Sequence, residues 1–238
     1  MASGPAAGPR AQTSAAAAAG DADALYAARE DLASAQRAEA IWAARLAAKP
    51  DDFEAAWKLA RARYWIGTRV PRDEGRRVLE AGIEAARAAR RMQPGRAEGP
   101  FWMAANMGAL AESFGLRQGL RYRGAIREAL LEALTIDPAF QQGSPDRALG
   151  RWYHKVPRLF GGSQTRSEEH LRRALTYNPD STITRYFLAE TLIALDRRGE
   201  ARTELQRVLE APIDPAWAPE DREFKAQARK LLQSMQAP

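Results

Sequence analysis

The chain has 238 residues, of which 45% are apolar and 28% charged, with a formal net charge of +6 and no cysteine. The lack of cysteine excludes disulfide bonds, thiolate metal sites and a cysteine nucleophile. No stretch approaches the roughly eighteen apolar residues that a membrane-spanning helix needs, and the length is sufficient for one large shared core.

Residues 1–20 are dominated by Ala, Gly, Ser and Pro and carry one charge, Arg10. Such a segment cannot bury enough apolar surface to fold, so we expect a disordered tail or linker, with a helical repeat domain at 21–238. The segment lacks the basic start and apolar centre of a signal peptide. Ala-rich stretches of this kind commonly join a lipid-anchored or cleaved N-terminus to an exported domain. The interpretation that a leader segment was removed is therefore retained as an alternative.

Five prolines divide the remaining chain at intervals of 33–44 residues: Pro50, Pro94, Pro138, Pro179 and Pro212. Before each proline, apolar residues recur at helical spacing, and polar residues that favour a helix start often follow it, as in Pro179-Asp180-Ser181. This period is typical of stacked helix pairs. Because strand-like alternation is absent, we predict an all-α fold, a right-handed α-α superhelix of about four degenerate helix pairs plus a C-terminal capping helix.

The last unit, 178–212, carries the clearest repeat motif. Apolar residues occupy the positions at which two helices of a repeat pack closely: Leu188, Ala189, Leu192, Ala201, Leu205 and Val208. This unit resembles the tetratricopeptide repeat (TPR). The earlier units are longer in the middle, so we expect longer helices or loops there, such as 113–121 and 156–165. The final helix, with Phe224 and Leu231 on one face, is expected to shield the last repeat.

Catalytic and metal-binding motifs are absent from the sequence. There is no GxSxG, GxGxxG, Walker or HExxH motif, and the two histidines, His154 and His170, come without further nominated ligands. We therefore expect no enzymatic activity, no cofactor and no metal. The positive charge is mostly arginine spread over every predicted helix, without a recognised nucleic-acid-binding module, so no nucleic-acid partner is expected.

The first helix of each TPR pair lines the concave face, and carrying those positions over by register gives an uneven groove. Aromatic and Met residues gather on the first two units, whereas the third unit places Arg147, Arg151, His154 and Lys155 on one helical stripe. Such a groove suits a ligand with an apolar body and a carboxylate, or an acidic peptide terminus. The alternative is that the aromatics form inter-repeat core and that the arginines are solvated or paired with Glu. The candidate groove residues are Trp57, Arg61, Tyr64, Trp65, Phe101, Trp102, Met103, Asn106, Met107, Arg147, Arg151, His154, Lys155, Tyr186 and Glu190.

Two segments suggest a narrower family. The stretch Ala97-Glu98-Gly99-Pro100-Phe101-Trp102-Met103-Ala104-Ala105-Asn106-Met107-Gly108, and the later Gly150-Arg151-Trp152-Tyr153 followed by Phe160-Gly161-Gly162-Ser163, resemble the T component (TatT family) of tripartite ATP-independent periplasmic (TRAP) transporters. Ala97, Pro100 and Ala104 depart from that family's pattern. The same Phe-Trp and Gly-Arg-Trp-Tyr elements are also similar to a related eukaryotic group of microtubule-associated regulators. We favour the bacterial family because it fits the composition better.

The transporter resemblance implies a periplasmic, non-enzymatic, often lipid-anchored protein that forms a ring-like oligomer with an internal hydrophobic pore. It implies two partners, a substrate-binding protein of the transporter and a hydrophobic or amphipathic small molecule. The membrane would be reached only through a lipid anchor absent from this sequence, and a chain complete as written would be cytoplasmic. The alternative function is a generic TPR protein–protein adaptor that binds an acidic peptide in its concave groove.

Overall fold

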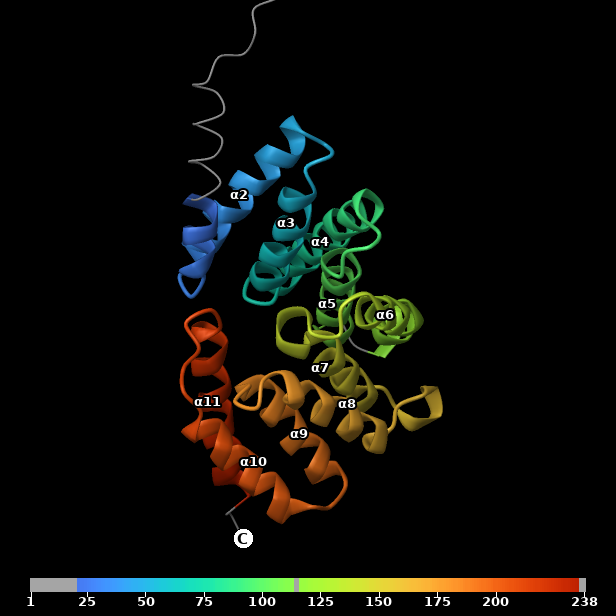
Figure 1. Cartoon of the computed structure of the whole chain (residues 1–238), viewed down its shortest axis with the longest axis vertical. Coiled ribbons are helices and arrows are strands. Elements are labelled where there is room, and N and C mark those ends of the chain that lie inside the picture. Colours follow the sequence, from blue (N-terminus) through green and yellow to red (C-terminus); the bar gives the residue numbers. More distant parts are fainter. Residues whose placement is uncertain (1–20, 114–115, 236–238) are drawn as a thin grey trace, which may run out of the picture.

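The computed structural model describes residues 21–113 and 116–235. The tail expected at 1–20 lies outside the described residues. The described part consists of helices and their connections, without a strand (Figure 1), which confirms the all-α prediction. After a short helical segment at 21–27, the helices are α2 (Leu32–Ala48), α3 (Phe53–Gly67), α4 (Arg72–Met92), α5 (Glu98–Ser113), α6 (Leu116–Ile136), α7 (Phe140–Lys155), the 3₁₀ turn η1 (Arg158–Phe160), α8 (Gln164–Tyr177), α9 (Thr182–Ala194), α10 (Arg198–Glu210) and α11 (Ala218–Ser234).

The five prolines set five helix ends. Helices α2, α4, α6, α8 and α10 each stop two residues before a proline, at Ala48, Met92, Ile136, Tyr177 and Glu210. The residue before a proline is sterically disfavoured in the α conformation, so the helix cannot continue to it. Two of the helices that follow these prolines start at a side-chain cap: Asp52 accepts from the Ala55 amide at 3.0 Å, and Ser181 from the Thr184 amide at 3.3 Å. The sequence therefore determines these boundaries locally.

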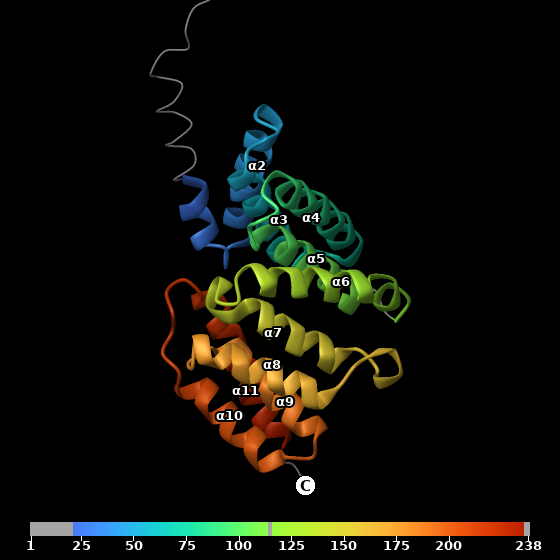
Figure 2. The ribbon, with the colours of Figure 1, turned by 45° about the vertical axis from the view of Figure 1, so that its right-hand side comes forward.

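The helices stack as the four predicted pairs, α3 with α4, α5 with α6, α7 with α8 and α9 with α10, as Figure 2 shows. The α7–α8 pair packs closely at Gly150, where an added Cβ would lie 2.5 Å from a Leu171 side-chain carbon. Buried apolar side chains form a hydrophobic core between the packed helices. Helix α11 packs Ala228 and Leu231 against the last pair, as expected of a capping helix. None of the helices in the described residues is both long and apolar enough to cross a membrane.

The extra residues expected in the middle of the first three repeat units are accommodated in two ways. In the first two pairs the second helix is longer, with 21 residues in α4 and α6 against 13 in α10. In the third pair the extra residues form the connection 156–163, which contains η1. Part of the loop expected at 113–121 falls on 114–115, outside the described residues, and the remainder belongs largely to α6.

The start of α7 was not predicted. Gln141, Gln142 and Gly143 have positive φ values of 44°, 62° and 78°, so regular helix begins only after them. Gly143 is needed because an added Cβ would lie 2.8 Å from the Tyr177 ring. Side-chain hydrogen bonds hold the strained residue Gln142, which donates to Asp214 at 3.0 Å and accepts from Asn178 at 2.6 Å.

The two ends of the superhelix contact each other at what we call the seam, defined by Arg29, Glu30 and Arg69 on one side and Glu220, Arg222 and Glu223 on the other. Arg29 donates to both carboxylate oxygens of Glu220 and, at 3.0 Å, to the carbonyl of Ala216. Arg222 pairs with Glu30, and Arg69 with Glu223 at 2.6 Å. In Figure 1 these parts meet at the left edge, where the red C-terminal region faces the blue N-terminal region. The seam closes the stack upon itself.

Candidate functional site: the inner wall

The predicted groove residues lie on α3, α5, α7 and α9, the first helices of the four pairs. Ion pairs join three of these helices: Arg151 of α7 contacts Glu112 of α5 at 3.2 Å and Glu190 of α9. The structure therefore brings the predicted first helices together as one inner wall. Glu112 was not among the predicted residues.

Most of the apolar candidates are packed between helices. Trp65, Phe101, Trp102, Met103 and Met107 are all buried. Asn106 is fully buried and donates to the carbonyls of Ala60, at 3.1 Å, and Trp102, at 2.8 Å, which ties α5 to α3. Trp102 also contacts the half-buried Tyr64 in a tilted arrangement, with ring centroids 5.8 Å apart. This is the packing that the inter-repeat core alternative describes.

Arg61 of α3 sits in an aromatic cage. Its guanidinium carbon lies 4.0 Å from the ring centre of Tyr26, 4.9 Å from that of Trp57 and 5.6 Å from that of Trp42. The Trp57 and Trp42 indole N–H groups and the Arg61 Nε are buried without a hydrogen-bond partner. Burial raises the pKa of Tyr26 to about 12. The chain's own arginine therefore fills this end of the inner wall.

The cationic stripe of α7 divides into residues with different surroundings. Arg151 is neutralised by its two glutamates and lies over the Phe187 ring at 4.5 Å. His154 shares a hydrogen bond with Gln164 at 2.8 Å, and burial lowers its pKa, while Lys155 is exposed. On α9, the Tyr186 ring contacts the tilted Phe224 ring of the capping helix, with ring centroids 5.3 Å apart. These groups are engaged in local contacts or solvated.

Arg147 differs from its neighbours because it is a buried cation without an acidic partner. Its side chain donates to Ser144 Oγ and lies over the Trp217 ring at 5.1 Å. No described carboxylate lies within the 4.0 Å of an ion pair, and burial lowers the pKa of Arg147 to about 10. Its guanidinium borders a cavity of about 180 Å³ between the start of α7, the start of α9 and the segment before α11.

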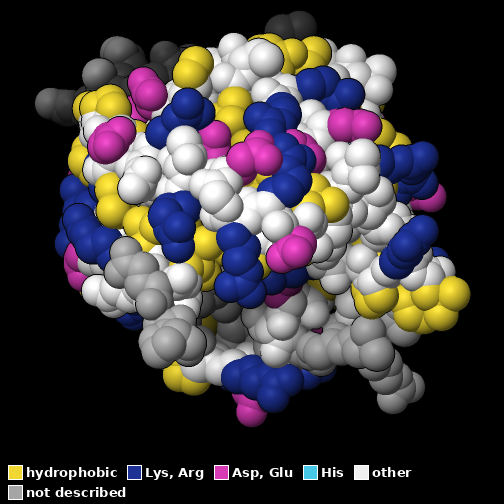
Figure 3. Space-filling model, turned by 90° about the horizontal axis from the view of Figure 1, so that it is seen from below, with side chains coloured by type: hydrophobic (Ala, Val, Ile, Leu, Met, Phe, Trp, Pro, Cys, Tyr) yellow, Lys and Arg dark blue, Asp and Glu magenta, His cyan; other side chains and the backbone are white. Residues whose placement is uncertain are grey.

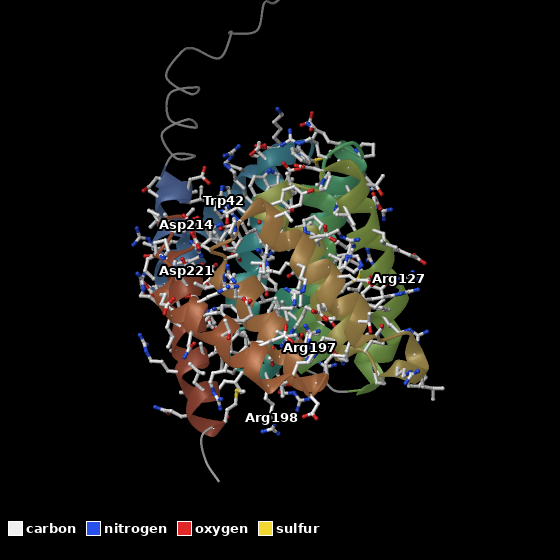
Figure 4. All side chains as sticks on the ribbon, turned by 60° about the horizontal axis from the view of Figure 1, so that its bottom comes forward. Trp42, Arg127, Arg197, Arg198, Asp214 and Asp221 are labelled. Carbon is white, nitrogen blue, oxygen red and sulfur yellow. The ribbon has the colours of Figure 1, made fainter. Side chains whose placement is uncertain are left out.

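Three aspartates line this cavity, and two of them, Asp214 and Asp221, accept hydrogen bonds from the protein. Asp221 accepts from the Thr182 hydroxyl at 2.6 Å and from the Asp214 amide at 2.8 Å. Asp214 accepts from Gln142 and from the Ala216 amide at 2.9 Å. Figure 4 shows Asp214 and Asp221 together on the α11 side of the molecule. Sequence reasoning missed these residues and Trp217, because they come from the capping segment rather than from a first helix.

Charge on the surface is mixed. On the face seen from below in Figure 3, basic and acidic side chains are interspersed. Within residues 21–113 and 116–235, no three His, Asp or Glu residues gather in a way that could hold a metal ion.

Comparison with known families identifies the relationship. A family model described as "Regulator of microtubule dynamics protein 1-3" matches residues 19–160, more than half of the chain. The chain belongs to this family. The region matched in this microtubule-dynamics regulator family includes the first of the two segments noted above and the second as far as Phe160, and it supports the second resemblance rather than the transporter one. A tetratricopeptide repeat model matches residues 165–224, which confirms the TPR prediction.

Solved structures agree on the fold of this family member. It matches the crystal structure of TTC0263, a thermophilic TPR protein of Thermus thermophilus, with 21% identity, a TM-score of 0.70, and coverage of 92% of this chain and 99% of that one. Two structures of MamA match at 16% and 15% identity, both with a TM-score of 0.51, covering 84% and 90% of this chain and 95% and 94% of theirs. At such identities the likeness concerns the fold alone. No curated protein matches the chain.

Proposed function

We propose that this protein is a non-enzymatic protein-interaction module that binds an acidic segment of a partner protein, with a partner carboxylate placed against Arg147. The observation that carries the proposal is that Arg147 is buried on the inner wall, beside a cavity, without a carboxylate of its own. TPR stacks offer their concave face as a binding surface, and this arginine is a buried inner-wall cation that no described carboxylate contacts within 4.0 Å.

The hydrogen-bonding geometry of the guanidinium favours a carboxylate as its direct partner. A guanidinium removed from water loses solvation that Ser144 and the Trp217 ring replace only in part. A carboxylate in the cavity would form short, charge-assisted and bidentate hydrogen bonds with it. The Asp214 and Asp221 carboxylates are unsuited to this role, since their oxygens already accept from backbone and side-chain donors.

The proposal is tested by fluorescence anisotropy with a labelled Asp/Glu hexapeptide that ends in a free carboxylate. The same peptide with an amidated C-terminus and a Lys hexapeptide serve as ligand controls. Arg147→Gln should weaken binding of the acidic peptide by about tenfold or more, the size expected for one charge-assisted hydrogen bond. The matched control is Arg91→Gln, an exposed arginine at the end of α4. Equal affinity of the wild type and Arg147→Gln would contradict the proposal.

The family description gives one specific partner to test. Because the matched family is described as regulating microtubule dynamics, assembled microtubules belong in a co-sedimentation assay with the same variants. Co-sedimentation of the wild type that is lost in Arg147→Gln and kept in Arg91→Gln would identify microtubules as the partner. Co-sedimentation that persists in both variants would place contact with microtubules elsewhere on the protein.

A second candidate is the transporter component with an apolar or amphipathic ligand, located in the periplasm and docking a substrate-binding protein. It is favoured by one observation, that the two segments resembling that family contribute to α5 and α7 of the inner wall. Native mass spectrometry tests it, since a retained small molecule that is lost in Met107→Glu would support it. An empty protein that still binds the acidic peptide would favour the interaction module alone.

A further inference from the structure

A second pocket, of about 240 Å³, lies at the edge of the superhelix where α6, α7, η1 and the start of α8 meet. Three arginines and three aromatic rings line it, and no carboxylate does: Arg123, Arg127, Arg166, Trp152, Tyr153 and Phe160. Figure 4 shows Arg127 on the α6 side of the molecule, opposite to Asp214 and Asp221. This edge pocket is therefore separate from the cavity at Arg147.

The three arginines of the edge pocket are not neutralised. Each guanidinium carbon lies beside an aromatic ring, Arg123 at 5.5 Å from Phe160, Arg127 at 6.0 Å from Trp152 and Arg166 at 5.7 Å from Tyr153. Within the described part of the chain, no carboxylate comes within 4.0 Å of any of the three. Three permanent positive charges thus converge on one small space.

The aromatic wall of the edge pocket is held in place from behind. The Trp152 indole N–H donates to the Arg123 carbonyl at 3.1 Å, which fixes that ring between α7 and α6. Tyr153 stacks on His170, with ring centroids 5.2 Å apart and planes inclined by 16°, and His170 is hydrogen-bonded to the buried Asp146 at 2.7 Å. A wall that does not need to be ordered on binding lowers the entropic cost of association.

The glycine segment after η1 completes the pocket. Gly161 has a φ of 101°, and an added Cβ at Gly162 would lie 1.6 Å from the Val156 carbonyl oxygen, so both positions require glycine. The Ser163 amide donates to the Tyr153 carbonyl at 2.9 Å and anchors the turn on α7. This turn brings Phe160 beside Arg123 of α6.

We propose that the edge pocket binds a phosphate ester carried on a flat ring. Guanidinium groups match phosphate oxygens in a planar, two-pronged geometry, and several of them suit a dianion better than a single carboxylate. The rings supply an apolar wall for the flat group. The volume corresponds to about eight waters at the roughly 30 Å³ that each occupies in the liquid, which suits one such ring with its phosphate. A phosphate ester joined to a flat ring, directly or through a sugar, has two sources: a phosphotyrosine side chain of a partner and a free nucleoside monophosphate.

The test is isothermal titration of the full chain with phenyl phosphate, beside inorganic phosphate and phenol. Arg127→Gln removes one exposed cation. Gly124→Leu fills the pocket, because Gly124 lines it and an added Cβ there meets no atom within 4 Å. The matched controls are Arg91→Gln and Gly199→Leu, a helical glycine outside the pocket whose Cβ also meets no atom within 4 Å.

We expect phenyl phosphate to bind, and both pocket variants to weaken it by about tenfold or more, while both controls and Arg147→Gln leave it unchanged. Tighter binding of AMP would identify the free nucleotide as the source, and tighter binding of a phosphotyrosine peptide the partner side chain. The proposal is overturned if phenyl phosphate shows no binding at millimolar concentration, if inorganic phosphate binds equally well, or if Arg147→Gln abolishes binding.

Discussion

Arginines play opposite parts at the seam and in the edge pocket. At the seam, Arg29, Arg69 and Arg222 each meet a glutamate from the other end of the chain. In the edge pocket, arginines lie beside aromatic rings and no carboxylate reaches them. The comparison shows that the residues behind the net charge of +6 have different roles in different regions of the molecule. Some of the positive charge closes the superhelix, and some is left available for an anion.

Burial decides how much each seam pair contributes. The Arg29 and Glu220 side chains are 6% and 16% exposed, whereas Arg222 and Glu30 are 52% and 51% exposed. Exposed pairs contribute little because water screens them, but breaking a buried pair leaves an uncompensated charge. The expected effects on stability therefore decrease from Arg29 through the inner wall to the edge pocket.

The largest effect is expected for Arg29→Ala. This change removes the bonds to Glu220, to the Ala216 carbonyl and to Tyr26, and leaves Glu220 without its partner. The free energy of unfolding should fall by about 3 kcal/mol, measured by urea denaturation. The control Glu30→Ala, at the exposed pair, should cost less than about 1 kcal/mol. Similar losses for the two variants would show that the seam does not depend on the buried pair.

Alkaline pH should lower the stability of the protein through Tyr26, whose ring lies beside Arg29. Burial raises the pKa of Tyr26 from 10.0 to about 12, so the unfolded chain loses this proton before the folded chain does. The contribution of Tyr26 to stability is fully present below pH 10 and is lost as the pH rises from 10 to about 12, by about 2–3 kcal/mol. Urea denaturation across this range checks the prediction. Tyr26→Phe should remove this part of the pH dependence, and an unchanged profile in that variant would assign the loss to other groups.

Arg147→Met should behave unlike Arg29→Ala although both arginines are buried. It replaces a cation that has no carboxylate by an apolar side chain of similar length, so the free energy of unfolding should stay equal or rise by about 1 kcal/mol. Thermal and urea denaturation measure the change. A loss of more than about 2 kcal/mol would mean that the charge of Arg147 is compensated within the folded chain.

The smallest effect is expected for Arg127→Gln in the edge pocket. The side chain is exposed and pairs with no described carboxylate, so stability should change by no more than about 0.5 kcal/mol. The same urea denaturation decides it. A larger loss would indicate that this arginine supports the fold rather than awaiting a ligand.

The sequence predicts those parts of the fold that depend on local chemistry. Prolines end five helices two residues ahead of themselves, and the period of 33–44 residues predicts the four pairs. The strained start of α7 at Gln141–Gly143 could not be predicted, because Gln142 accepts a hydrogen bond from Asn178 and donates one to Asp214, both distant in the chain. The seam was missed for the same reason, since Arg29 and Glu220 are separated by 191 residues.

The inner wall shows the same limit within one helix. Helical spacing places Arg147 and Arg151 on one face of α7, and that prediction is a matter of local geometry. Which of them is neutralised depends on Glu112 and Glu190, each 39 residues from Arg151 in the chain. Sequence reasoning therefore finds the stripe but does not separate a paired arginine from an unpaired one.

The most direct test of the account compares these two arginines in one experiment. Anisotropy titrations of the acidic hexapeptide with the wild type, Arg147→Gln and Arg151→Gln remove the same charge from neighbouring turns of one helix. The account predicts a loss of about tenfold or more for Arg147→Gln and a much smaller change for Arg151→Gln, whose charge its two glutamates already compensate. Equal losses for the two variants, or a greater loss for Arg151→Gln, would contradict it.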